Sequence, residues 1–145
     1  MNIRAPIDKV DFELYYNFRW KNLRKPLGQK EGTEKDELEN ESYHLMIVDG
    51  DNILGVGRIH FIVNNLNKKA QIRYMAIDRN FQKRGCGSLL LKELEAIALT
   101  KKVKHIFLHS RESAVHFYLK NKYNKIKKSH ILLGQIQHWY MEKEL

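Results

Sequence analysis

The stretch IRYMAIDRNFQKRGCGSLLL, residues 72–91, decides the fold. It begins inside the segment Ala70–Ile77, which follows a turn signal and is expected to be a strand. It ends in the clearest helical pattern of the chain, Ser88–Thr100, and a basic loop joins the two. The apolar residues of this pattern fall on one helical face: Leu90, Leu91, Leu94, Ile97 and Ala98. The stretch therefore predicts a strand, a loop and a helix that begins at the loop.

The loop contains the residue types that bind an anion. Gly85 and Gly87 let the backbone turn sharply and approach a ligand closely. The N–H groups of the first helical turn point at the same place, with the positive end of the helix dipole behind them. Lys83 and Arg84 add full positive charges. The natural ligand of such a loop is a pyrophosphate.

Three phosphate-binding patterns compete for this loop. The Walker pattern requires a lysine after its last glycine, whereas Ser88 follows Gly87 directly. The dinucleotide-binding fingerprint requires a tighter turn and a third glycine, at the position that Leu90 occupies. The third pattern, Gln/Arg-x-x-Gly-x-Gly/Ala before a helix, is matched in full by Gln82, Gly85 and Gly87.

The remaining segments predict a mixed α/β fold. We expect a helix over Asp11–Arg24 and a short second helix after Thr33, where acidic residues suit the positive end of a helix. Short turns between consecutive strands imply antiparallel pairing, and the strand–helix–strand passage from Ile72 to Leu108 implies one parallel pair. The other expected elements are, in chain order, strands Asn2–Arg4, Tyr43–Val48, Ile53–Val63 and His105–His109, helix Ala114–Tyr123, and strands Lys125–Leu133 and Ile136–Met141. The predicted architecture is a mostly antiparallel sheet flanked by helices, in the order (β)ααβββαβαββ.

Length and composition limit the setting in which the chain works. Its 145 residues show no repeat and no change of composition, so we expect a single domain over residues 1–145. No apolar stretch reaches the ~18 residues of a membrane span, and the N-terminal residues lack a signal-peptide pattern. One cysteine, Cys86, cannot form an internal disulfide, so the expected location is the cytoplasm. The net charge of +9 favours an anionic partner, but no nucleic-acid-reading motif accompanies it.

These segments resemble the GNAT family of acetyl-CoA-dependent N-acetyltransferases. Tyr74-Met75-Ala76-Ile77-Asp78 is similar to the family's strand before the loop, and Phe81–Gly87 with Leu89–Leu91 is similar to its loop and helix. Ala114–Tyr118 with Asn121–Tyr123 is similar to its Ala-x-x-Phe-Tyr-x-x-x-Gly-Phe helix end. The resemblance implies the same fold, acetyl-CoA as cosubstrate, and acetyl transfer to a primary amine of a small molecule or peptide.

The resemblance also implies roles for single residues. The backbone of Met75 and Ile77 would pair with the pantetheine arm of acetyl-CoA, and an N–H there would face the thioester oxygen. Tyr118 would lie near the thioester sulfur and protonate the departing thiolate. The loop that would bind the cosubstrate comprises Gln82, Lys83, Arg84, Gly85, Cys86, Gly87 and Ser88. No metal is implied, because the seven histidines lack a metal-ligand spacing.

Several residues leave alternatives open. Lys122 stands where the family usually has glycine, so a different helix end is expected, and Arg111 stands where many members have an asparagine. The acidic residues of Glu34–Glu41 would either guide a cationic amine or form a solvated helix face, and we favour the solvated face. His109 is either a catalytic base or, as we favour, a structural hydrogen-bonded residue. A non-catalytic module of the same fold that binds acyl-CoA or nucleic acid is the alternative function, and a homodimer is left open.

Overall fold

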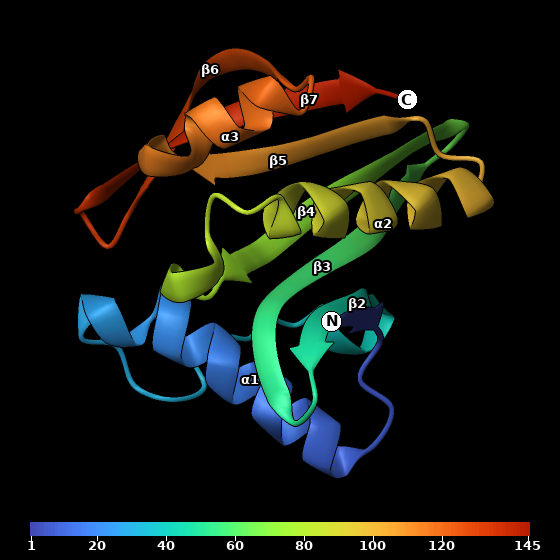
Figure 1. Cartoon of the computed structure of the whole chain (residues 1–145). Helices are drawn as coiled ribbons and strands as arrows, with labels where there is room; N and C mark the ends of the chain where they lie inside the picture. The colour runs from blue at the N-terminus through green and yellow to red at the C-terminus, as the bar shows by residue number, and fades with distance from the viewer. The chain divides into compact units, whose positions relative to one another are not determined.

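The computed structural model describes residues 1–145 and contains a seven-stranded sheet with three α-helices (Figure 1). The helices are α1 (Lys9–Leu23), α2 (Cys86–Thr100) and α3 (Val115–Lys120). The strands are β1 (Asn2–Arg4), β2 (Tyr43–Asp49), β3 (Asn52–Asn64), β4 (Asn67–Ile77), β5 (His105–Arg111), β6 (Asn124–Leu132) and β7 (Ile136–Glu144). No helix combines the length and the apolar character that crossing a lipid bilayer requires.

The strands lie in the order β1-β2-β3-β4-β5-β7-β6. The pairs β1–β2, β2–β3, β5–β7 and β6–β7 are antiparallel. The pair β4–β5 is parallel, with Ala70 opposite Ile106 and Gln71 opposite Phe107. The predicted fold class, a mostly antiparallel sheet flanked by helices, is confirmed.

Contacts between residues divide the chain into two compact units. Unit 1 comprises Met1–His60 and Tyr74–Leu94, and unit 2 comprises Phe61–Arg73 and Glu95–Leu145. Since the boundaries cut β3, β4 and α2, each of these elements contributes residues to both units.

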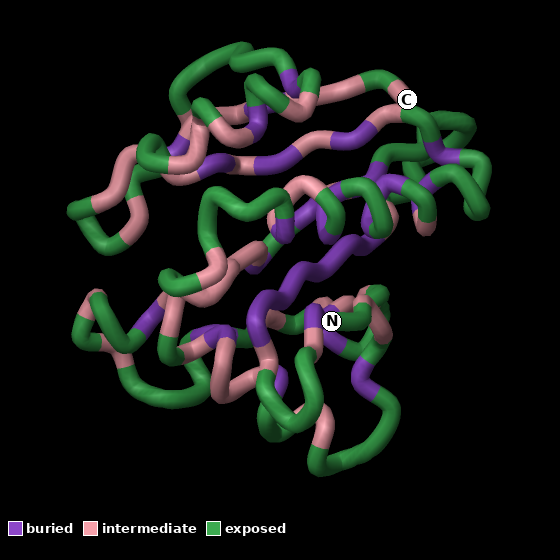
Figure 2. The backbone as a smooth tube through the Cα atoms, in the orientation of Figure 1, coloured by how far each residue is buried: buried purple, intermediate pink, exposed green.

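The core of unit 1 lies on both faces of β3. Residues Leu54–His60 are buried without interruption, which Figure 2 shows as a continuous purple segment. On one face Tyr15 of α1 packs against Met46 and Val56. On the other face a Cβ at Gly57 would come within 2.9 Å of Leu94 Cδ1. Glycine at position 57 therefore leaves room for the Leu94 side chain of α2, which would have to shift if a Cβ stood there.

Unit 2 is built around β5 and a buried polar group at Glu95, in the second half of α2. Alternate residues of β5 are buried, among them Ile106 and Leu108. The Tyr123 hydroxyl donates to Glu95 Oε2 at 2.9 Å, and Lys143 Nζ lies 3.1 Å from both carboxylate oxygens of Glu95. This carboxylate is buried but has two donors, as a charge inside a protein requires.

The predicted second helix after Thr33 is wrong. The segment forms only a short 3-10 turn, Glu39–Glu41. The reason is local, since Asp36 Oδ1 accepts from the Leu38 N–H at 2.9 Å and Glu39 Oε2 accepts from the Asp36 N–H at 3.0 Å. Side chains that bond nearby amides compete with helical hydrogen bonding.

The prediction that Lys122, in place of glycine, gives helix α3 a different end is also wrong. Lys122 adopts the left-handed backbone of the glycine it replaces, with φ at 73°. The Tyr123 N–H donates to Tyr118 O at 3.0 Å and the Lys122 N–H donates to Leu119 O at 3.1 Å. These are the two hydrogen bonds of a Schellman motif, so lysine takes the strained position without changing the helix end.

Candidate functional site

The end of β4 is tied to the glycine loop that follows it. The Asp78 N–H donates to Leu54 O at 2.7 Å, and the Asp78 side chain accepts from the Asn80 N–H at 2.8 Å. The Gln82 side chain donates from Nε2 to Ile77 O at 3.1 Å. Gln82, expected among the cosubstrate-binding residues, therefore uses its side chain to hold the loop against the strand end.

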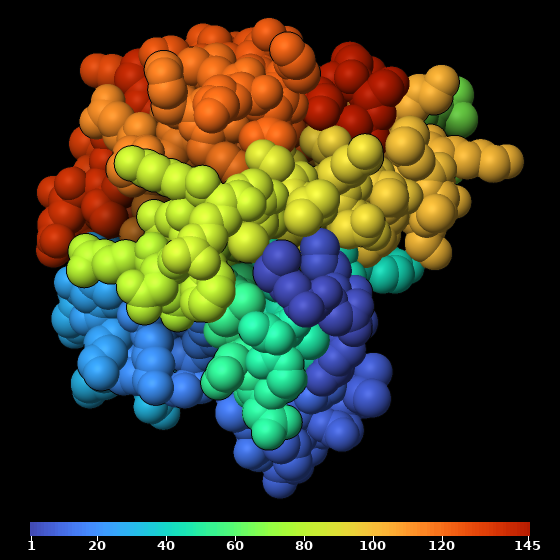
Figure 3. Space-filling view, in the orientation of Figure 1, coloured from blue at the N-terminus to red at the C-terminus, as the bar shows by residue number.

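The loop backbone leaves open space above it. Lys83 and Gly85 have left-handed backbone, with φ at 62° and 83°. A Cβ at Gly85 would meet no atom within 4 Å. Figure 3 shows this yellow-green part of the chain on the face turned to the viewer. A ligand can thus approach the backbone here directly.

Helix α2 begins at Cys86 with donors that have no partner inside the helix. The Leu89 N–H makes the first helical hydrogen bond, to Gly85 O at 3.1 Å. The N–H groups of Cys86, Gly87 and Ser88 come before the Leu89 N–H, so the helix provides no carbonyl to accept a hydrogen bond from them. No acidic residue stands in the first turn of the helix. Free amides at a helix N-terminus, together with the helix dipole, are the arrangement that attracts anions.

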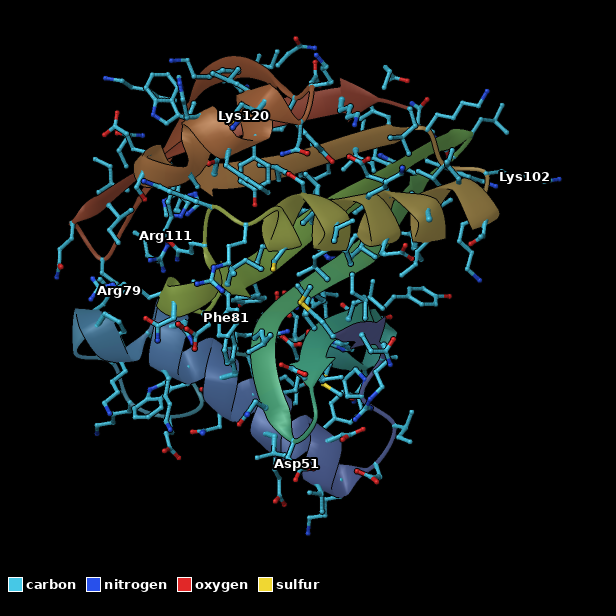
Figure 4. All side chains as sticks on the ribbon, viewed as in Figure 1. Asp51, Arg79, Phe81, Lys102, Arg111 and Lys120 are labelled. Atoms are coloured by element: carbon cyan, nitrogen blue, oxygen red, sulfur yellow. The ribbon has the colours of Figure 1, made fainter.

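Basic and aromatic side chains surround the helix start. Lys83 and Arg84 are exposed, and the Arg84 guanidinium lies 5.2 Å from the centroid of the Phe81 ring. Figure 4 labels Phe81 and Arg79 on the short turn Arg79–Phe81 just before the loop. The positive charge predicted for the loop is thus available to a ligand.

Cys86 contributes only backbone to this site. Its residue is 3% exposed, and its Sγ lies 3.9 Å from Met1 Sδ. A thiol turned into the protein cannot contact a phosphate group, whereas the N–H of the same residue belongs to the first turn of α2.

The side chains of Met75 and Ile77 are turned toward β3. Met75 Cγ lies 3.2 Å from the place where a Cβ of Gly57 would stand, and Ile77 Cδ1 lies 2.7 Å from that of Gly55. These glycines therefore leave room for the two side chains, and this packing fixes which way the strand presents its backbone. Tyr74, just before Met75, has left-handed backbone with φ at 57°.

A buried ion network lies beside this strand, and sequence reasoning missed it. Glu39 joins Arg19 and Arg58, with N–O distances of 2.9 and 2.8 Å. The interpretation of Glu34–Glu41 as a solvated face is wrong for Glu34 and Glu39, which are buried. No sequence signal links these residues, because their partners stand up to 20 positions away. Burial raises the pKa of Tyr16 to about 12, and the nearby Glu39 carboxylate acts in the same direction.

Tyr118 belongs to unit 2, whereas the glycine loop and the end of β4 belong to unit 1. The Tyr118 residue is 8% exposed. Its ring centroid lies 5.0 Å from that of Phe117 and 5.7 Å from that of Tyr123. Burial raises the pKa of the Tyr118 hydroxyl, so the group keeps its proton at neutral pH.

His109 lies in a cluster of imidazoles and aromatic rings in unit 2. Its ring centroid is 5.4 Å from that of His130 and 5.6 Å from that of Tyr140, and His130 stacks on His138 at 4.4 Å. Its Nδ1 is buried and has no hydrogen-bond partner. The prediction that His109 is a hydrogen-bonded residue is therefore wrong for Nδ1, which lies among packed rings. The chain contains no group of three or more His, Cys, Asp or Glu side chains arranged to hold a metal ion.

Two known proteins have similar sequences, and one of them is named as an N-acetyltransferase. The chain is 29% identical over 111 residues to the uncharacterized N-acetyltransferase YjcF of Bacillus subtilis strain 168, which covers 77% of this chain and 76% of that protein. It is 26% identical over 112 residues to the uncharacterized protein YyaT of the same strain, which covers 77% and 72%.

Solved structures share the fold at low sequence identity. One is an aminoglycoside 6'-N-acetyltransferase complexed with coenzyme A, with a TM-score of 0.79, 14% identity, and coverage of 99% of this chain and 97% of that one. Another is an acyl-CoA N-acyltransferase from Pseudomonas aeruginosa, with a TM-score of 0.80, 14% identity, and coverage of 98% and 97%.

The family assignment rests on the sequence itself. The model of the acetyltransferase (GNAT) family matches residues 12–123, a span that includes most of α1, the glycine loop and the Phe117-Tyr118 pair. The chain belongs to the GNAT acetyltransferase family.

Proposed function

We propose that this protein transfers an acetyl group from acetyl-CoA directly to a primary amine of a small molecule or peptide. The observation that carries the proposal is the open loop of residues 83–88 at the start of α2. There, unpartnered helical amides and exposed basic side chains favour a pyrophosphate. Coenzyme A carries such a group.

In this proposal the cosubstrate is held at two places in unit 1. Backbone amides of Cys86, Gly87 and Ser88, with Lys83 and Arg84, bind the pyrophosphate. The backbone of Met75–Ile77 pairs with the pantetheine arm, and one N–H there donates a hydrogen bond to the thioester oxygen, on which negative charge develops. A preorganised donor of this kind contributes about 2.7–4 kcal/mol to lowering a barrier.

Tyr118 is the proposed general acid. The neutral amine nitrogen forms a bond to the acetyl carbon, the carbon–sulfur bond breaks, and the sulfur takes a proton from the Tyr118 hydroxyl. The nitrogen then releases its extra proton to solvent, and Tyr118 takes up a proton from solvent, which restores the hydroxyl. An amine with a pKa near ~10.4 must lose a proton before it attacks. The Tyr118 hydroxyl is protonated at neutral pH, as a general acid must be before the thiolate leaves. Burial raises its pKa, which makes proton transfer to the sulfur harder, so the role depends on the position of the hydroxyl.

A screen for release of the coenzyme A thiol tests the reaction. Acetyl-CoA is mixed with the protein and, separately, with polyamines, amino acids, aminoglycosides and peptides, and the acetylated product is identified by mass spectrometry. Release that depends on both the protein and one class of amine supports the proposal. Tight binding of acetyl-CoA without release for any amine favours the binding-only alternative, for which the burial of Tyr118 is the supporting observation.

A further inference from the structure

Tyr74 has a backbone conformation that is rare for an aromatic residue in a strand. Its φ is 57° although it lies within β4, and it directly precedes Met75. Side chains with a Cβ rarely adopt this region, and such residues persist only where their surroundings hold them. The contacts of Tyr74 are therefore the place to look for what maintains the shape of β4.

Three buried arginines lie around the ring of Tyr74, and the most distant is Arg24, with its Cζ 5.7 Å from the ring centroid. Arg19 Cζ lies 4.3 Å from the ring centroid and Arg58 Cζ lies 5.0 Å from it. Arg19 and Arg58 are 0% exposed, and Tyr74 is 8% exposed. Guanidinium groups attract aromatic faces most strongly where water is excluded. We call Arg19, Arg58 and Tyr74 the arginine clamp.

Carboxylates fix the orientation of both guanidinium groups. Glu39 accepts from Arg19 Nη1 through Oε1 at 2.9 Å and from Arg58 Nη1 through Oε2 at 2.8 Å. Asp36 accepts from both terminal nitrogens of Arg58, at 2.6 and 3.0 Å. Arg19 Nη2 also donates to the Tyr15 hydroxyl at 2.9 Å. Because the guanidinium is a rigid fork, these bonds set the planes that the ring contacts.

The clamp contains two buried donors that lower its contribution to stability. The Nε atoms of Arg19 and Arg58 are buried without a hydrogen-bond partner. Buried ion networks often stabilise a protein less than apolar residues of the same volume, and orphaned donors add to the cost. This cost points to a role other than stability, and the strained residue of the clamp, Tyr74, directly precedes the backbone proposed to bind acetyl-CoA.

We propose that Arg19 and Arg58 are positioning residues that hold the left-handed backbone of Tyr74, so that Met75–Ile77 presents its N–H and C=O groups to the pantetheine arm. A left-handed residue within a strand redirects the peptide groups that follow it. The inference rests on the proposed function for its purpose, but the effect on the strand is independent of that function.

The first test exchanges residues of the clamp conservatively. Arg19→Lys keeps the charge but loses the fork and the planar face, so the acetyl-CoA Kd from calorimetry should rise at least about tenfold. Tyr74→Leu should do the same, whereas Tyr74→Phe keeps the ring face and should stay within about threefold. Equal effects of Tyr74→Leu and Tyr74→Phe would overturn the role of the ring.

Two core truncations in unit 2 serve as controls for stability. Ile106→Val is a mild change and Leu108→Ala a strong one, and together they bracket the loss of Tm expected for Arg19→Lys. Both controls should leave the acetyl-CoA Kd unchanged. If a control with an equal loss of Tm weakens binding as much as Arg19→Lys, the clamp is merely structural and the inference fails.

A double substitution tests whether the arginine acts through the ring. Arg19→Lys combined with Tyr74→Leu should weaken binding no more than the worse single change, because each removes the same contact. If the increases in Kd of the two single variants multiply in the double variant, the two residues contribute separately and the inference fails.

Amide hydrogen exchange tests whether the clamp holds residues 75–77 in place, and the measurement needs no cosubstrate. Arg19→Lys should speed exchange at residues 75–77 more than at residues 45–48 of β2, whereas the core truncations should not. Unchanged exchange at residues 75–77 overturns the inference even if binding weakens. If the wild-type chain does not bind acetyl-CoA, the proposed function fails, and this exchange result alone decides whether the clamp holds the strand.

Discussion

Lys102 and Lys122 occupy equivalent positions at the ends of two helices, α2 and α3, and both have left-handed backbone, with φ at 59° and 73°. At the end of α2 the Val103 N–H donates to Ala98 O and the Lys102 N–H donates to Leu99 O, each at 3.0 Å. Figure 4 shows Lys102 pointing away from the protein at this end. Each lysine therefore accepts backbone strain at a place that glycine usually occupies.

Replacing either lysine with glycine should stabilise the protein. Lys102→Gly and Lys122→Gly remove the clash of Cβ with the backbone, and each should raise the free energy of unfolding by about 1 kcal/mol. Urea unfolding monitored by circular dichroism measures the change. Lys102→Ala and Lys122→Ala keep the Cβ and should give no such gain, so an equal gain from alanine would rule out relief of strain as the cause.

A carboxylate in the first turn of α2 should block the proposed pyrophosphate site. Gly87→Glu should weaken coenzyme A binding at least about tenfold through charge repulsion. The fold should be retained or slightly stabilised, because an acidic residue suits the helix N-terminus and glycine does not suit a helix. Calorimetry and a melting curve on the same sample test both points. Gly87→Gln is the uncharged control, and unchanged affinity in the glutamate variant would place the site elsewhere.

Removing the Tyr118 hydroxyl should slow turnover and spare binding. A positioned proton donor contributes about 10²–10⁴-fold to a rate, so Tyr118→Phe should lower kcat within that range. Thiol release and calorimetry with acetyl-CoA give the two quantities.

Tyr123 offers a matched control for Tyr118, since both rings are buried in the same unit. Tyr123→Phe loses the hydrogen bond to Glu95 and should lower Tm while kcat stays near normal. Normal turnover in Tyr118→Phe together with a lowered Tm would assign Tyr118 to the core and remove it from the mechanism.

Acid should destabilise the protein through its histidine cluster. Burial lowers the pKa of His138 to about 4, and the positively charged forms of His130 and Arg111 act in the same direction. The unfolded chain binds this proton near pH ~6.5, so the stabilisation is complete above that pH and is lost as the pH falls toward 4. Each such group changes the free energy of unfolding by at most about 1.4 kcal/mol per pH unit.

Melting curves between pH 8 and pH 4 measure this loss of stability. His138→Gln removes the titrating ring and should flatten the dependence below pH ~6.5. An unchanged slope in that variant would assign the acid sensitivity to other groups, among them His44, whose pKa burial also lowers.

The sequence predicted features that depend on neighbours along the chain. The stretch of residues 72–91 contains a strand, a glycine loop and an apolar helical stripe within one continuous segment. The structure has the same three parts in the same places, and Leu90, Leu91 and Leu94 are buried. Periodicity and glycine positions suffice here, because each part is determined by residues a few positions away.

Features that depend on distant residues were not predictable. Glu39 follows other acidic residues and looks like part of a solvated surface, but its partners are Arg19 and Arg58, on α1 and β3. The left-handed backbone of Tyr74 has no local signal either, since no glycine or asparagine stands there. The left-handed backbone of Lys122 was not predicted either. The hydrogen bonds at the helix end outweigh the preference of lysine for right-handed backbone.

The burial of Cys86 makes the protein convenient to label. Thiol reagents modify accessible thiolates, and the single thiol of this chain is 3% exposed under the start of α2. A cysteine introduced at an exposed position, such as Leu66 at the β3–β4 turn, would carry a fluorophore or spin label at one site with Cys86 left in place. Ligand-induced changes could then be followed by spectroscopy in an otherwise native sequence.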